Sequence, residues 1–116
     1  MTEKHMGNLK KARKALKQNK NKEHAEKYKV KVEQMKNNKG NIVMNHFIIY
    51  VNNGIFFQSY DSIIAFKSNE GKIFLDENDW NYSRTTGKYR NNFLNEGIEE
   101  TRDKIKKGIY NLTNLN

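Results

Sequence analysis

A strongly apolar segment, Ile42 to Val51, is followed at once by the dipeptide Asn53-Gly54, and this succession constrains the fold more than any other feature of the chain. β-branched and aromatic residues dominate the segment, which predicts a β-strand. Both faces of that strand are largely apolar, so we expect it to be central and covered on both sides. Asn-Gly between two such runs is a strong signal for a β-hairpin. The sequence therefore predicts an antiparallel sheet that starts from this hairpin.

Three further strands are predicted after the hairpin turn. They span Ile55 to Ser59, Ser62 to Lys67 and Lys72 to Leu75. A Ser-Asn-Glu-Gly turn at residues 68–71 separates the last two strands. The simplest arrangement is a four-stranded antiparallel meander.

The last third of the chain has helical patterns. After a connector from Asp76 to Ser83, one helix is predicted from Thr85 or Thr86 to Asn95 and a second from Glu99 to Lys107. The second begins with acidic and ends with basic residues, which suits the helix dipole. Residues 109–115 are expected to form a short edge segment against the sheet. The predicted class is α+β, with two C-terminal helices on one face of the sheet.

The N-terminal third has a different character. From Asn8 to about Asn37 it contains no proline and few β-branched residues, which predicts a basic N-terminal helix or a helical hairpin. The polar stretch near residues 19–21 is either the joint of two short helices or the weak middle of one long helix. A polar break at residues 37–41 follows. We therefore expect two parts, a basic helical arm over residues 1–40 and a compact α+β domain over residues 41–116.

The excess positive charge lies in the arm. Residues 1–40 carry 13 Lys and Arg against 4 Asp and Glu, a net charge of +9, whereas residues 41–116 carry 9 of each. Such a concentration of charge attracts a polyanion, namely DNA, RNA or an acidic protein surface, unless it only keeps the arm solvated. The candidate contact residues in the arm are Lys10, Lys11, Arg13, Lys14, Lys17, Lys20 and Lys22.

Several classes of protein are excluded or disfavoured by composition. The chain contains no cysteine, which excludes disulfides and thiolate metal sites and fits a reducing cytoplasm. Its longest apolar run, Phe47 to Val51, is too short for a signal peptide or a membrane span. We expect a cytoplasmic protein that has a modest hydrophobic core and does not contact a membrane.

No group of residues predicts catalysis. His5 and His24 fall in the arm and His46 falls within a strand, and they show no metal-ligand spacing. His46 is interpreted as a strand residue whose polar ring is satisfied. The acidic run at residues 76–79 either binds Mg²⁺ or suits the loop before a helix, and we favour the second interpretation. The expected protein is not an enzyme and has no cofactor, metal ion or small-molecule substrate.

A second basic segment, Ser83 to Arg90, ends in a Gly-Lys pair but lacks the first glycine and the Ser/Thr of a phosphate-binding loop. Its serine and threonines predict a capped helix with free backbone N–H groups at its start. Arg84, Lys88 and Arg90 surround that start, which indicates a site for a backbone phosphate. The alternative is a capped helix with ordinary surface cations.

The Trp-x-Tyr-Ser-x-Thr-Thr-Gly-Lys segment at residues 80–88, together with the runs 59–65 and 71–77, resembles a small domain of unknown function found in phages and prophages of low-GC Gram-positive bacteria. The resemblance covers about residues 45–116 and leaves out the basic arm. It brings no catalytic residues. It implies a phage accessory protein, a class that commonly binds nucleic acid or blocks a host machine.

Our leading hypothesis is a phage-encoded, non-catalytic inhibitor of a host nucleic-acid machine in the bacterial cytoplasm. An anti-CRISPR-type protein that binds a Cas nuclease or its guide RNA fits best, because the domain would supply specificity and the basic arm fast association. The alternative hypothesis is a phage DNA- or RNA-binding accessory protein that acts through the basic arm.

Overall fold

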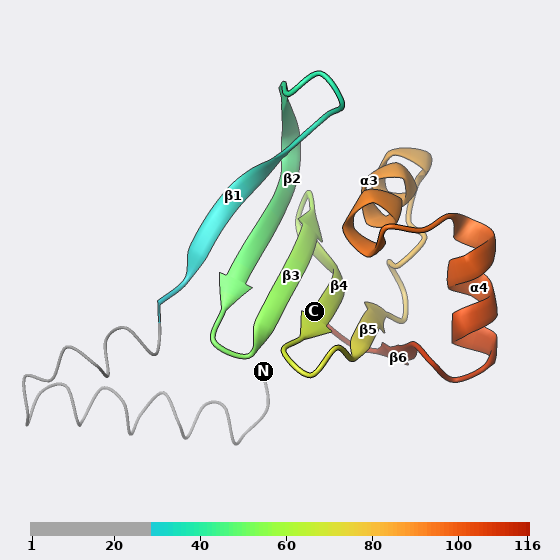
Figure 1. The fold of residues 1–116 in the computed structure, drawn as a ribbon. Helices are drawn as coiled ribbons and strands as arrows, with labels where there is room; N and C mark the ends of the chain where they lie inside the picture. The colour runs from blue at the N-terminus through green and yellow to red at the C-terminus, as the bar shows by residue number, and fades with distance from the viewer. Residues whose placement is uncertain (1–28) are drawn as a thin grey trace, which may run out of the picture. The chain divides into compact units, whose positions relative to one another are not determined.

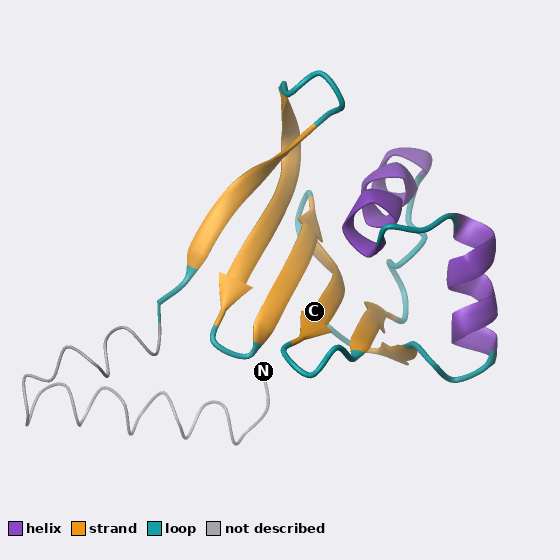
Figure 2. Ribbon diagram, in the orientation of Figure 1, coloured by secondary structure: helices purple, strands orange, loops and turns teal. Residues whose placement is uncertain are grey.

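The computed structural model describes residues 29–116, and Lys31–Asn116 form one compact unit in which a sheet carries two helices (Figures 1 and 2). No helix of this described part is long and apolar enough to cross a membrane. In chain order the elements are β1 (Lys31–Lys36), β2 (Ile42–Val51), β3 (Gly54–Ser59), β4 (Ser62–Ser68), β5 (Ile73–Asp76), α3 (Arg84–Leu94), α4 (Ile98–Lys106) and β6 (Asn111–Thr113).

The sheet has six strands whose spatial order follows the sequence. Each pair from β1 to β5 is antiparallel, as short connections require, whereas β6 lies parallel to β5. A parallel pair needs a crossover connection, and here α3 and α4 together supply it. Both helices lie on the same side of the sheet in Figure 1.

The core lies between the sheet and α3. Ile48, Phe57, Ala65 and Leu75 occupy one cross-strand row, and Phe57, Ala65 and Leu75 are fully buried. Side chains of α3 complete the cluster from the other side, since the helix turns one apolar face to the sheet. Burying each large apolar side chain contributes about 1.5–3 kcal/mol. The core residues that α3 provides are Tyr89, Phe93 and Leu94.

The other face of the sheet carries a second apolar row, Val32, Ile49, Phe56, Phe66 and Phe74. The rings of Phe56 and Phe66 have centroids 4.4 Å apart, so the row is itself packed. Val32 at its edge is 57% exposed. The prediction that the strand Ile42–Val51 is covered on both sides is therefore not met by helices of the described part, because both of them lie on the opposite face.

The predicted N-terminal helix is wrong where it can be compared. Lys31–Lys36 form β1, which pairs with β2 at the edge of the sheet and belongs to the same compact unit. Lys, Glu, Gln and Met favour helices, and Val32 and Met35 have helical spacing, so the local pattern indicated a helix. Pairing with β2 overrides that preference. Residues 8–28 of the predicted helix lie outside the described residues.

The predicted four-stranded antiparallel sheet is also wrong, because the sheet has six strands and is mixed. The strands β2 to β5 occur within a residue or two of their predicted positions, and both C-terminal helices are present. The segment expected at residues 109–115 contains β6, whose three residues pair with β5. A parallel partner of this kind cannot be read from local pattern, because two helices separate the strands along the chain.

Candidate functional site

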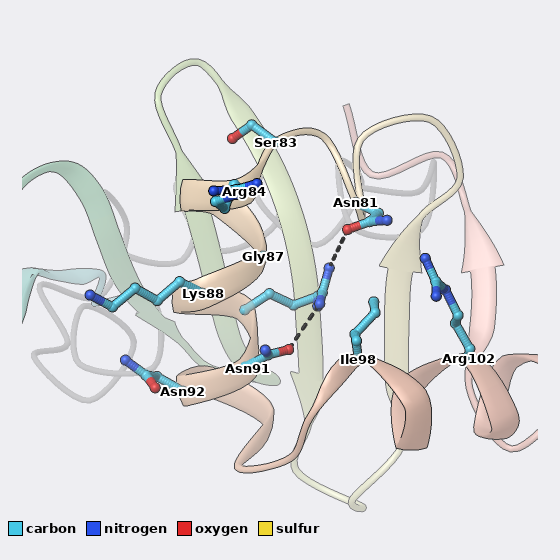
Figure 3. Close-up of a pocket in the computed structure, with 10 residues that line it drawn as sticks. Asn81, Ser83, Arg84, Gly87, Lys88, Asn91, Asn92, Ile98 and Arg102 are labelled. Carbon is cyan, nitrogen blue, oxygen red and sulfur yellow. Dashed lines mark hydrogen bonds between the residues drawn. The ribbon is translucent and has the colours of Figure 1, made fainter.

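The described part contains a pocket between α3 and the start of α4, with a volume of about 630 Å³ (Figure 3). Its walls come from one side of α3, from the connector before it and from the first turns of α4. Nine of its ten lining residues are polar or glycine, and none is acidic. They are Asn81, Ser83, Arg84, Gly87, Lys88, Arg90, Asn91, Asn92, Ile98 and Arg102.

The helix α3 places two of the predicted cations side by side. Its N-cap is Ser83, whose hydroxyl accepts a 3.1 Å hydrogen bond from the backbone N–H of Thr86, as the sequence predicted. Arg84 and Lys88 stand four residues apart and so share one face of the helix. Both line the pocket. All three cations of the predicted phosphate-binding segment therefore line one cavity, Arg84 and Lys88 as exposed residues and Arg90 as a buried one.

Arg102 is the third exposed cation of the pocket, and the sequence analysis did not identify it as a site residue. It comes from α4, where it stands four residues after Ile98, another lining residue. Its 3.4 Å ion pair with Glu99 joins two largely exposed side chains, so that pair holds the guanidinium weakly. The spacing within α4 is visible in the sequence, but nothing local shows that this face of α4 turns toward α3.

Arg90 is not a surface cation, contrary to the expectation that it surrounds the helix start. It is 1% exposed and lies beneath the pocket. Its Nη1 donates to the backbone O of Trp80 at 2.9 Å and to Oδ1 of Asn81 at 3.1 Å, and its Nη2 donates to Oδ1 of Asn91 at 2.8 Å. The guanidinium also lies 5.2 Å from the ring centroid of Trp80.

No carboxylate within the described residues hydrogen-bonds to Arg90, whose Nε is buried without a partner. Burial lowers the pKa of its guanidinium, the charge of Arg102 lowers it further, and Glu96 acts in the opposite direction. A desolvated charge that is not neutralised at short range has a strong field. Arg90 therefore adds to the positive potential of the pocket without touching solvent.

A chain of polar side chains, buried from His46 through Ser59 to Thr86 and ending at the exposed Ser83, joins the sheet to the start of α3. Ser83 Oγ donates to Thr86 Oγ1 at 3.1 Å, Thr86 Oγ1 and Ser59 Oγ are 2.8 Å apart, and Ser59 Oγ lies 3.2 Å from Nε2 of His46. His46 Nδ1 is 2.8 Å from the backbone O of Met44. Both ring nitrogens of His46 thus have partners, which confirms the interpretation of His46 as a satisfied strand residue.

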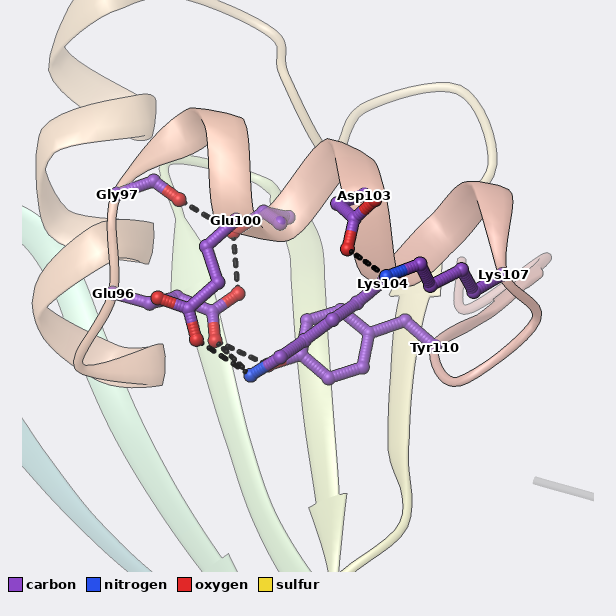
Figure 4. A network of polar contacts seen from close by, with 8 residues as sticks. Glu96, Gly97, Glu100, Asp103, Lys104, Lys107 and Tyr110 are labelled. Carbon is purple, nitrogen blue, oxygen red and sulfur yellow. Dashed lines mark hydrogen bonds and ion pairs between the residues drawn. The ribbon is translucent and has the colours of Figure 1, made fainter.

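The position of α4, and with it Arg102, depends on Glu96 in the connection between the helices (Figure 4). Its side chain is 2% exposed and accepts hydrogen bonds from Thr101 Oγ1 at 2.6 Å, Tyr110 Oη at 2.6 Å and Lys104 Nζ at 2.8 Å. Burial alone would raise the pKa of Glu96, but these bonds, led by that of Lys104, hold it below its ordinary value. The carboxylate thus ties the middle of α4, and Tyr110 beyond its end, to one point.

The acidic run at residues 76–79 has a structural role at its first residue. Asp76 is fully buried and accepts from the backbone N–H of Asn78, Asp79 and Leu115. Residues 29–116 contain no group of three or more His, Asp or Glu side chains arranged to hold a metal ion. The carboxylate of Asp76 thus holds the backbone of the connector and of the C-terminal segment in place.

Seven of the predicted contact residues belong to the basic arm. Lys10, Lys11, Arg13, Lys14, Lys17, Lys20 and Lys22 all lie outside the described residues. The prediction that they contact a partner therefore stays a prediction. The geometry available for a binding site is that of α3 and α4.

Comparison with known proteins identifies a family but no activity. The model of a family of unknown function, DUF8033, matches residues 30–111. No curated protein and no solved structure matches the chain. The matched range begins at the residue before β1, which agrees with the inclusion of β1 in the sheet. The match carries no information on phage origin, so that part of the resemblance stays a prediction.

Proposed function

The chain belongs to DUF8033, a family of unknown function, and we propose from its own residues that it binds nucleic acid without catalysing a reaction. The pocket between α3 and α4 would hold a phosphate of the sugar–phosphate backbone. The observation that carries the proposal is the meeting of Arg84, Lys88 and Arg102 in one cavity that no acidic residue lines.

Electrostatics favours a polyanion over an isolated anion. The chain has a formal net charge of +9, so its long-range field attracts an extended anionic partner. Each phosphate that a lysine or arginine neutralises releases condensed counterions, which makes such binding strong at low salt. Asn81 and Asn92, which also line the pocket, supply neutral hydrogen-bonding groups that suit phosphate and sugar oxygens.

The test is binding of the full chain to labelled single-stranded RNA and DNA, followed by fluorescence anisotropy over a series of salt concentrations. Arg84→Ala, Lys88→Ala and Arg102→Ala should each weaken binding roughly threefold at low salt and reduce the salt slope by about 0.7–0.9. Lys72→Ala is the matched control, because Lys72 is an exposed lysine of the same unit outside the pocket. Pocket variants that bind like the control would contradict the proposal.

The more specific proposal is that the protein is a phage-encoded inhibitor in the cytoplasm of the host bacterium, where it binds a Cas nuclease or its guide RNA. Its support is the charge of residues 1–40 and the resemblance of residues 80–88 to phage proteins. Guide RNA offers both a backbone for the pocket and a polyanion for the arm. The accessory DNA- or RNA-binding protein is the alternative.

Recovery from host lysate separates the two. The full chain and a version that lacks residues 1–40 would each be used as bait, with and without nuclease treatment. One host protein complex that survives nuclease treatment supports the inhibitor. Nucleic acid alone, lost at high salt, supports the accessory protein and contradicts the inhibitor.

A further inference from the structure

Gly87 is a glycine that the fold does not require. It lies inside α3, where glycine is disfavoured relative to alanine, and its backbone is helical. A Cβ at this position would meet Arg90 Nη2 at 3.6 Å, Arg90 Nη1 at 3.7 Å and Asn81 Oδ1 at 3.7 Å, which are ordinary contacts. Neither backbone conformation nor packing explains the residue. Because Gly87 has no side chain, the pocket stays open as far as the hydrogen bond between Arg90 and Asn81.

Arg90 fixes the orientation of two asparagines that line the pocket. An arginine side chain only donates, so the amide groups of Asn81 and Asn91 must turn their Oδ1 atoms toward it, as observed. Their Nδ2 groups consequently point away from Arg90 (Figure 3). No acceptor for either Nδ2 occurs within residues 29–116. Arg90 is thus a positioning residue that presents two amide donors.

The charged side chains of the pocket are all donors. Arg84, Lys88 and Arg102 have no acceptor atom, and the two oriented amides add further N–H groups. Three accessible cations lie over a fourth that is buried. The ligand that uses such a set has several free oxygens and more than one negative charge.

A phosphodiester within a strand has a single charge on two free oxygens. A phosphate monoester has three free oxygens and a charge of about −1.5 to −2 near pH 7. We infer that the pocket receives the terminal phosphate of a nucleic-acid strand, with Arg84, Lys88 and Arg102 neutralising its charge and Asn81 and Asn91 donating to its oxygens. This inference rests on the proposed nucleic-acid binding and specifies which phosphate the pocket selects.

The experiment compares one oligonucleotide in three forms, with a 5′-phosphate, with a 3′-phosphate and with hydroxyl groups at both ends. The full chain should bind one phosphorylated form roughly tenfold more tightly than the hydroxyl form, since charge-assisted hydrogen bonds are the strong ones. The two phosphorylated forms distinguish which end is recognised. Inorganic phosphate should compete more strongly against the phosphorylated form.

Two variants test the role of the pocket floor. Gly87→Ala places a methyl group above Arg90 and should bring the preference for the phosphorylated form close to one, while leaving the thermal melting temperature unchanged or higher. Asn81→Asp keeps an oxygen toward Arg90 but turns a second, charged oxygen to the pocket, and should weaken the phosphorylated form most. Gly97→Ala is the control, because no atom lies within 4 Å of its Cβ and it is outside the pocket.

The possible failures are distinguishable. Equal affinity for all three forms, with weaker binding by Arg84→Ala and Lys88→Ala, would overturn the terminal-phosphate inference and leave the proposed function standing. Binding that no pocket variant changes would overturn both. A preference for the phosphorylated form that survives Gly87→Ala and Asn81→Asp would place the recognition elsewhere and also overturn the inference.

Discussion

The backbone N–H of Leu115 donates a 2.9 Å hydrogen bond to Oδ1 of Asp76, although 39 residues separate the two in the sequence. The other oxygen of the same carboxylate accepts from the backbone N–H of Asn78 and Asp79. One buried carboxylate therefore attaches both the connector before α3 and the segment after β6 to the end of β5.

This arrangement predicts a loss of stability in acid. Burial alone would raise the pKa of Asp76, but the hydrogen bonds, led by that from Leu115, hold it below its ordinary value. A lowered folded pKa stabilises the protein above the unfolded pKa of about 3.9, and this stabilisation is lost as the pH falls through the folded pKa. Asp76→Asn should lower the unfolding free energy by about 1.5–3 kcal/mol at neutral pH. It should also make the fall of that free energy with decreasing pH less steep.

Urea unfolding from about pH 7 down to pH 3 measures this effect. Asp61→Asn is the control, because Asp61 is exposed in the turn between β3 and β4. If the unfolding free energy of Asp76→Asn falls with decreasing pH as steeply as that of the wild type, other carboxylates are responsible.

Gly54 should tolerate no side chain. A Cβ there would lie 2.1 Å from the backbone O of Lys67 and 2.5 Å from Cζ of Phe66. The nearest atom is backbone of the paired strand β4, which cannot move without breaking the sheet. We expect Gly54→Ala to lower the unfolding free energy by about 3 kcal/mol or more. Gly97→Ala is the control: with no atom near its Cβ, it should change the unfolding free energy by about 1 kcal/mol or less. Thermal unfolding measures both variants, and equal losses of stability would contradict the steric argument.

The hydrogen-bonded side chains from Ser83 to His46 predict one histidine tautomer. The backbone O of Met44 only accepts, so neutral His46 has its proton on Nδ1 and accepts at Nε2 from Ser59. The chemical shifts of the ring nitrogens show directly which nitrogen carries the proton. A proton found on Nε2 would contradict this assignment and reverse the donors and acceptors in the series of hydrogen bonds. Ser59→Ala leaves the buried Nε2 of His46 without a partner and removes one of the two side-chain partners of Thr86 Oγ1. It should cost about 1–3 kcal/mol, compared with Ser62→Ala as control.

The network around Glu96 predicts a high-pH titration. Burial first, and then the hydrogen bond to Glu96, raises the pKa of Tyr110 to about 12. Because the folded state binds this proton more tightly, stability is present below the unfolded pKa of about 10 and is lost as the pH rises toward the folded value. Glu96→Gln should lower the pKa of Tyr110 but leave it above about 10, since burial remains.

Tyrosine absorbance during a pH titration follows this change. Glu99→Gln is the matched control, because Glu99 is an exposed residue of α4 whose recorded partner is Arg102. A tyrosine titration that Glu96→Gln leaves unaltered would mean that burial alone raises the pKa of Tyr110.

The part of the candidate site at the start of α3 could be predicted from the sequence, whereas the rest could not. Ser83 to Lys88 indicated a capped helix with cations at its start, because capping and i, i+4 spacing are local properties of the sequence. The burial of Arg90 was not predictable, since an arginine in a polar segment is normally exposed. Arg102 was not predictable either, because its place at the pocket depends on how the hydrogen bonds of Glu96 position α4.

Sequence alone determined the strands β2 to β5, the hairpin at Asn53-Gly54 and both C-terminal helices, because each depends on a periodicity or turn within a few residues. The tertiary structure alone decided that Lys31–Lys36 are a strand, that β6 lies parallel to β5, and that α4 completes a basic pocket. Pairing and helix packing join residues that are distant along the chain. Their free energy comes from contacts between distant residues, which the local sequence does not show. For β1 these contacts outweigh the helix propensity of its own residues.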